Sequence, residues 1–188
     1  YGYTGELIAR EAVARGMAPV LAGRNEQKTG ALARELGVEA RVFDLDKDAI
    51  SGQLADIDVV IHCAGPFSAT APPMIAACLA SQTHYLDITG EIEVFEHLFA
   101  QHEAAVAAGV VLCSGAGFDV VPTDCVAARL AEEMPEAQHL ALGFDTRSGL
   151  SPGTAKTTVE GLAGGGKIRR EGRIETVKLA AQTRRIDF

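Results

Sequence analysis

The sequence predicts an α/β fold in which helices cover both faces of a doubly wound parallel sheet. Segments with the helical spacing of apolar residues alternate with short apolar segments over the first 135 residues. The short segments, such as residues 58–63 and 110–113, are continuous apolar runs and do not alternate with polar residues. Strands that are buried on both faces by crossover helices have this composition.

Local signals place the individual elements. The first helix ends at Gly16, the second begins with Asn25 as its N-cap and ends at Gly37, and a later helix has Pro72 near its start. The predicted strands are residues 18–22, 38–43, 58–63, 84–86 and 110–113. The predicted helices are residues 6–15, 25–36, 47–54, 72–80, 91–108 and 122–133.

The pattern changes near Pro135, where we predict a domain boundary. Residues 1–135 form the sheet domain, and residues 136–188 form the start of a truncated α+β domain. In this second part the sequence predicts strands at residues 140–144 and 174–179 and a helix at residues 153–162. About fifty residues are too few for an independent domain of this kind, so we expect them to rest on other parts of the protein.

The charge balance excludes some classes of partner. The 188 residues include 17 Lys and Arg and 25 Asp and Glu, which gives a formal net charge of −8. Nucleic acids and anionic membranes attract basic surfaces, so neither is expected as a main partner. No apolar stretch approaches the roughly 20 residues of a membrane span, and no leader of basic and then apolar residues is visible. We therefore expect a cytoplasmic protein without a membrane span.

A glycine turn opens the first helix. Gly2 and Gly5 are three residues apart, like the last two glycines of a turn that binds a diphosphate at a helix N-terminus. A Rossmann-type dinucleotide fold begins with a strand that leads into such a turn. We expect the first glycine and that strand to lie before Tyr1. Two glycines alone fit an ordinary loop equally well.

The residue after the next strand distinguishes NAD from NADP. NAD-binding domains carry Asp or Glu about 20 residues after the turn, where the carboxylate binds the ribose hydroxyls. This chain has Arg24 at about that spacing. A guanidinium binds a 2′-phosphate through paired hydrogen bonds, whereas a carboxylate repels it. The sequence thus favours NADP, and a solvent-exposed cation beside a helix is the alternative.

Two further segments extend the predicted cofactor site. Gly65 follows the strand that ends at Cys63, and a glycine there lets the backbone approach a ligand closely. Asp44 follows the strand at residues 38–43 and is either an adenine contact or a turn carboxylate. The predicted cofactor contacts are Gly2, Tyr3, Thr4, Gly5, Arg24, Asn25, Asp44, Ala64, Gly65, Pro66 and Phe67.

Four segments together resemble a known family: residues 2–5, 22–25, 84–91 and 117–124. They are similar to segments of the saccharopine dehydrogenase-like family, which includes bacterial trans-acting enoyl reductases and saccharopine dehydrogenase-like oxidoreductases. The resemblance is good over residues 1–135 and loose beyond them. It implies an NADP-binding domain followed by a domain that binds a small-molecule substrate and forms a homodimer. It also implies a reductase that acts on an imine or an enoyl double bond.

The candidate catalytic residues are Tyr85, Asp87 and Asp119, because hydride transfer needs a proton donor and these residues lie near strand ends. Asp119 fits a turn or helix cap as well, and Glu91 fits a carboxylate at a helix start. Compact metal-ligand spacing is absent, so no metal is expected. The alternative to an oxidoreductase is a module that binds NADP as a sensor or scaffold without catalysis.

Overall fold

The computed structural model divides the chain into two compact units, Tyr1–Leu140 and Ala141–Phe188, which are described separately here. The residues that the structure describes are 1–45, 50–118, 120–140, 142, 155, 158–159, 161–162, 164–181 and 183.

The first unit alternates helices with parallel strands, which confirms the predicted α/β class. The strands are β1 (Leu21–Gly23), β2 (Ala40–Val42), β3 (Val59–His62), β4 (His84–Asp87) and β5 (Leu112–Cys113). The helices are α1 (Tyr3–Ala14), α2 (Glu26–Leu36), α3 (Ile50–Gln53), α4 (Phe67–Ser81), α5 (Ile92–Phe99), α6 (His102–Ala108) and α7 (Val121–Glu133).

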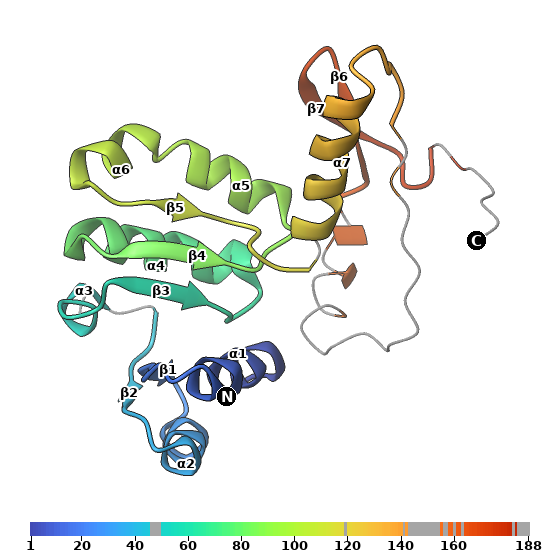
Figure 1. Ribbon diagram of the computed structural model, residues 1–188. Coiled ribbons are helices and arrows are strands. Elements are labelled where there is room, and N and C mark those ends of the chain that lie inside the picture. The colour runs from blue at the N-terminus through green and yellow to red at the C-terminus, as the bar shows by residue number, and fades with distance from the viewer. Residues whose placement is uncertain are drawn as a thin grey trace. The chain divides into compact units, whose positions relative to one another are not determined.

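The strands form two parallel sheets. In one sheet β1 pairs with β2, and in the other the order is β3-β4-β5. Figure 1 shows β3, β4 and β5 side by side and pointing the same way, so their carboxyl ends meet at one edge. Ligands of open α/β sheets bind beyond this edge, where four of the predicted cofactor contacts, residues 64–67, follow β3.

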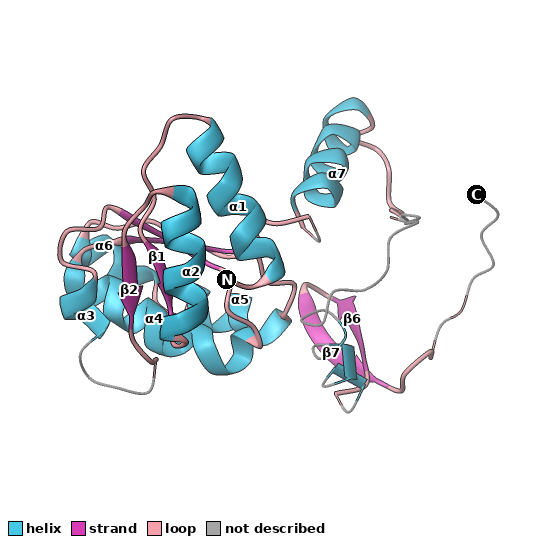
Figure 2. Ribbon diagram, turned by 90° about the horizontal axis from the view of Figure 1, so that it is seen from below, coloured by secondary structure: helices cyan, strands magenta, loops and turns pink. Residues whose placement is uncertain are grey.

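The main core lies between α4 and the three-stranded sheet. Helix α4 packs against β4 and also against α3, α5 and α6. Its apolar side chains are joined in the core by residues of those neighbours, including Ile50, Tyr85 and Leu98. Helices α1 and α2 run side by side at the other sheet, where α2 packs on both β1 and β2 (Figure 2).

The prediction that the strands are buried on both faces is wrong for β3 in this chain. Its side chains alternate in direction, so Val60 and His62 point to the face opposite that of Val59 and Ile61. His62 is buried, whereas Val59 and Ile61 are 44% and 48% exposed. The described residues therefore bury one face of β3, and leave Val59 and Ile61 on its other face about half exposed.

Two helices differ most from the sequence prediction, and α1 begins at Tyr3, three residues before its predicted start. Helix α4 begins at Phe67, five residues before the predicted start at Pro72, because a distant carboxylate supplies acceptors for its first amides. The predicted helix at residues 91–108 is two helices. The amide of Gln101 donates to the carbonyl of Leu98, three residues back, and this tighter turn separates α5 from α6.

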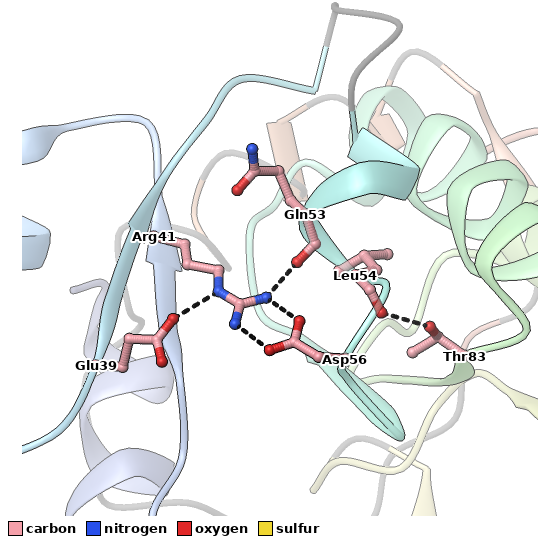
Figure 3. A network of polar contacts seen from close by, with 6 residues as sticks. All are labelled: Glu39, Arg41, Gln53, Leu54, Asp56 and Thr83. Atoms are coloured by element: carbon pink, nitrogen blue, oxygen red, sulfur yellow. Dashed lines mark hydrogen bonds and ion pairs between the residues drawn. The ribbon is translucent and has the colours of Figure 1, made fainter.

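An arginine connects β2 to the segment that precedes β3. Arg41 donates to Glu39, to both carboxylate oxygens of Asp56 and to the carbonyl of Gln53 (Figure 3). Its guanidinium lowers the pKa of Asp56. Next in the chain, Leu54 accepts a hydrogen bond from the hydroxyl of Thr83, just before β4. This network joins the two-stranded sheet to the three-stranded one.

The second unit contains an antiparallel hairpin of β6 (Gly166–Arg170) and β7 (Arg173–Val177). The sequence predicted a strand at 174–179 and missed β6, whose basic residues and preceding glycines resemble a loop. Three of the five residues of the predicted strand at 140–144 lie outside the described residues, as do five of the ten of the predicted helix at 153–162. The described residues of the latter, 155, 158–159 and 161–162, are helical. Among the described helices, none is long and apolar enough to cross a membrane.

Candidate functional site

The glycine turn leads directly into α1. Gly2 is the N-cap residue and no side chain caps this helix end, so Tyr3, Thr4 and Gly5 form an open first turn. The first amides of a helix have no intrahelical acceptor and carry the positive end of the helix dipole. The arrangement can bind an anion, as the sequence predicted for a diphosphate.

Two close contacts place this turn between the carboxyl ends of β1 and β3. A Cβ atom at Gly23, the last residue of β1, would lie 2.5 Å from Cε1 of Tyr1. A Cβ atom at Gly5 would lie 3.7 Å from Cβ of Cys63, the residue after β3. The start of α1 is thus adjacent to both strand ends, and Arg24 follows Gly23 immediately.

Arg24 and Lys28 are exposed cations at the start of α2. Between them, Asn25 caps the helix by accepting a hydrogen bond of 2.9 Å from the amide of Lys28, which confirms its predicted capping role. Within the described part of the chain, neither cationic head group has an ion-pair partner. In contrast, carboxylates bind the guanidinium groups of Arg10, Arg15, Arg41 and Arg129.

The loop at residues 64–67 is held from inside the protein. The hydroxyl of Thr70 donates to the carbonyl of Ala64 and also lies 3.0 Å from that of Pro66. Phe67 is buried, and its ring meets the ring of His62 edge-on at 5.6 Å. The side chain of Phe67 is therefore part of the core, and what this loop offers a ligand is backbone.

His62 supports this loop as a neutral group. Burial lowers its pKa to about 4, although the nearby Asp87 carboxylate acts in the opposite direction. Because the single hydroxyl proton of Thr70 goes to a carbonyl, Nε2 of His62 carries a proton and donates to that oxygen at 3.0 Å. A neutral imidazole with this tautomer is a fixed structural donor near neutral pH.

Asp87 is fully buried at the end of β4 and accepts four hydrogen bonds. One oxygen accepts from the amides of Thr89 and Gly115, and the other accepts from the hydroxyls of Tyr85 and Ser114. Burial, followed by the charge of Asp87, raises the pKa of Tyr85. The structure thus pairs two predicted catalytic residues inside the protein, where they hold the loop that follows β5. Their catalytic role stays a prediction.

Glu91 holds the loop after β3, as Asp87 holds the loop after β5. Its carboxylate accepts from the amides of Phe67 at 3.0 Å and Ser68 at 2.7 Å, which are the first two residues of α4. Its own amide donates to the hydroxyl of Thr89, which is buried. The sequence suggested a helix-start carboxylate but could not identify this partner, because 24 residues separate Phe67 from Glu91.

Two further predicted site residues are Asp44 and Asp119. Asp44 is exposed after β2 and accepts from the amide of Leu45, as a turn carboxylate does. Asp119 lies outside the described residues. No group of three His, Cys, Asp or Glu side chains in the described part of the chain is arranged to hold a metal ion. The sequence run 62–67 had indicated a cofactor wall that includes His62, but sequence reasoning missed Thr70 and Lys28 as parts of this region.

Comparison with known proteins agrees with the resemblance seen in the sequence. The chain is 31% identical over 179 residues to a Mycobacterium tuberculosis protein provisionally named as a trans-acting enoyl reductase, covering 86% of this chain and 42% of that protein. It is 27% identical over 196 residues to the saccharopine dehydrogenase-like oxidoreductase of Mus musculus, covering 90% of this chain and 46% of that protein. The chain thus spans less than half the length of these relatives.

A solved structure shows the same fold. The apo saccharopine dehydrogenase (L-Glu forming) of Saccharomyces cerevisiae superposes with a TM-score of 0.66 at 20% identity, over 94% of this chain and 42% of that one. Residues 1–113 match the saccharopine dehydrogenase NADP binding domain family. This match covers more than half of the chain, from the glycine turn to the end of β5. The chain belongs to the saccharopine dehydrogenase NADP-binding family.

Proposed function

We propose that this chain is the NADP-binding domain of an oxidoreductase that transfers a hydride to or from an imine, enoyl or carbonyl group of a small-molecule substrate. The observation that carries the proposal is the position of Arg24, an exposed cation that directly follows Gly23 beside the glycine turn and has no ion-pair partner in the described part of the chain. Lys28, another exposed cation, follows in the first turn of α2. The family implies NADP, and NADP differs from NAD by a 2′-phosphate that needs such cations.

The ends of three helices support one orientation of the cofactor. Asn25 caps α2 and the Glu91 carboxylate occupies the start of α4, whereas no side chain caps α1. A diphosphate is attracted to the open N-terminus of α1 and repelled by Glu91 at the N-terminus of α4. The diphosphate then lies at Gly2 and Gly5 and the 2′-phosphate at Arg24, and the resemblance to the family implies that residues 65–67 lie on the nicotinamide side. When bound, the nicotinamide supplies or accepts the hydride.

The two parallel sheets fit a single doubly wound sheet. Among the described strands, β1 has no partner on the side away from β2, and β3 has none on the side away from β4. The glycine turn lies between the ends of these two strands. A strand leading into the turn would pair with both and give the order expected of a Rossmann-type fold. Dimerisation through a second domain and a cytoplasmic location stay predictions.

A non-catalytic NADP-binding module is the second candidate. The observation that favours it is the burial of Tyr85 and Asp87, whose polar groups are bound to each other and to the loop after β5. The hydroxyl of Tyr85 and the carboxylate of Asp87 thus already have hydrogen-bond partners within the protein. Under this alternative, the domain binds NADP as a sensor or scaffold, and no hydride is transferred.

The test separates the two candidates. NADPH and NADH are titrated against the whole protein, and NADPH oxidation is then followed with a panel of imines, enoyl thioesters and ketones. We expect NADPH to bind more tightly than NADH and to be oxidised with at least one substrate class. Binding without turnover on any of them supports the sensor, and equal or absent binding of both dinucleotides contradicts the NADP assignment.

A further inference from the structure

A continuous set of hydrogen bonds crosses the carboxyl edge of the three-stranded sheet. It runs from the amide of Gly115, after β5, to Asp87, then through Thr89 to Glu91 at the start of α5. From Glu91 it reaches the amides of Phe67 and Ser68, after β3. One segment of eight residues, 84–91, therefore fixes the loops on both sides of it.

Glu91 is the member of this set that acts on the predicted nicotinamide side. Its two carboxylate oxygens each accept from one amide, and bonds from amides to a charged carboxylate are stronger than those to neutral acceptors. These bonds allow α4 to begin at Phe67, directly after the turn at Gly65 and Pro66. Without the acceptor, the first turn of α4 would have two unpaired amides.

We propose that Glu91 is a positioning residue that holds residues 64–67 in the conformation needed to receive the nicotinamide half of the cofactor. This inference rests on the proposed NADP-binding function. The carboxylate has a second effect: it puts a negative charge on the helix end that could otherwise compete with α1 for the diphosphate. Glu91 thus acts on binding through the backbone of the loop and through its charge, without contacting the cofactor.

The test compares two ligands that differ in the nicotinamide. NADPH has both halves of the cofactor, whereas 2′-phospho-ADP-ribose lacks the nicotinamide. In Glu91→Gln the side chain keeps its size but loses its charge and one acceptor. We expect NADPH binding to weaken about tenfold and 2′-phospho-ADP-ribose binding to change by less than about twofold. The matched control is Glu93→Gln, an exposed carboxylate in the first turn of α5, which should leave both affinities unchanged.

A measurement on the unmodified protein makes the test independent of how well the variant folds. Hydrogen exchange should be slower at the amides of Phe67 and Ser68 than at those of Thr4 and Gly5, whose helix end has no side-chain acceptor. Exchange that is as fast at α4 as at α1 overturns the proposal.

An equal loss of both ligands in Glu91→Gln, or no loss of either, also overturns it. A wild-type protein that binds neither ligand contradicts the proposed NADP function itself, and the exchange comparison then decides whether Glu91 holds the loop.

Discussion

The two halves of the carboxyl edge use their polar groups in opposite ways. After β3, β4 and β5, polar side chains are turned inward: Asp87, Glu91 and Thr70 bind loop backbone. After β1, Arg24 and Lys28 are exposed, and neither forms an ion pair with a carboxylate in the described part of the chain. A site that must be preorganised is held from within, and a site that must attract an anion keeps its cations accessible.

The largest expected effect concerns the inward-facing half. Asp87→Ala leaves the amides of Thr89 and Gly115 and two hydroxyls without their buried acceptor, and we expect the free energy of unfolding to fall by about 3–4 kcal/mol. Asp87→Asn should cost less, because its carbonyl oxygen still serves the amides. Urea unfolding measures both, with the exposed Asp58→Ala as the control. If Asp87→Ala lowers the free energy of unfolding no more than Asp58→Ala does, the proposed difference between the two halves of the edge is wrong.

The pH dependence of stability gives the next largest effect. The folded protein holds His62 neutral down to about pH 4, whereas an unfolded histidine takes up a proton near pH 6.5. Between these values the unfolded state binds more protons, so stability falls as the pH falls, by about 3 kcal/mol for this group. In His62→Gln, which keeps an N–H donor, this part of the slope should disappear from unfolding curves measured at pH 4.5 and 7. An unchanged slope would show that His62 is accessible to protons in the folded state.

Two glycine substitutions test the difference between the two halves of the edge, with smaller expected changes in stability. In Gly117→Ala the new Cβ would lie 2.9 Å from Cβ and 3.2 Å from Cα of Ile88, so we expect a loss of about 1–3 kcal/mol of stability. In Gly2→Ala the new Cβ meets nothing within 4 Å, so stability should be unchanged while NADPH binding weakens. Thermal unfolding and NADPH titration separate these outcomes. A destabilised Gly2→Ala protein, or one with unchanged affinity, contradicts the assignment of the turn.

Local signals predicted the parts of the structure that depend on local chemistry. Asn25 caps α2 and Gly37 ends it in the left-handed conformation, as the sequence indicated. The sequence could also have predicted the pairing of Tyr85 with Asp87, because residues two apart in a strand point to the same face. It could not have predicted the start of α4, because the acceptor for its first amides, Glu91, is 24 residues away in the sequence. The partial exposure of Val59 and Ile61 among the described residues likewise depends on packing that no local pattern encodes.

Spacing in the sequence predicted one exposed cation, Arg24. The structure adds a second, Lys28, about one helical turn further along the chain. Their shared lack of carboxylate partners in the described part of the chain is visible only in three dimensions. Another cation of the same helix, Arg34, donates to the carbonyl of Gly30 in the last turns of α2. It provides a charge-matched control away from the predicted phosphate position.

The preference for NADP+ over NAD+ tests the central claim most directly. The ratio of the two dissociation constants is measured in the whole protein, in Arg24→Gln/Lys28→Gln and in Arg34→Gln. We predict that the double variant loses at least about tenfold of its preference through weaker NADP+ binding alone, since each lost charged hydrogen bond contributes about 1.5–3 kcal/mol. Arg34→Gln should keep the preference. Equal weakening of both dinucleotides, or an unchanged ratio in the double variant, would contradict the account.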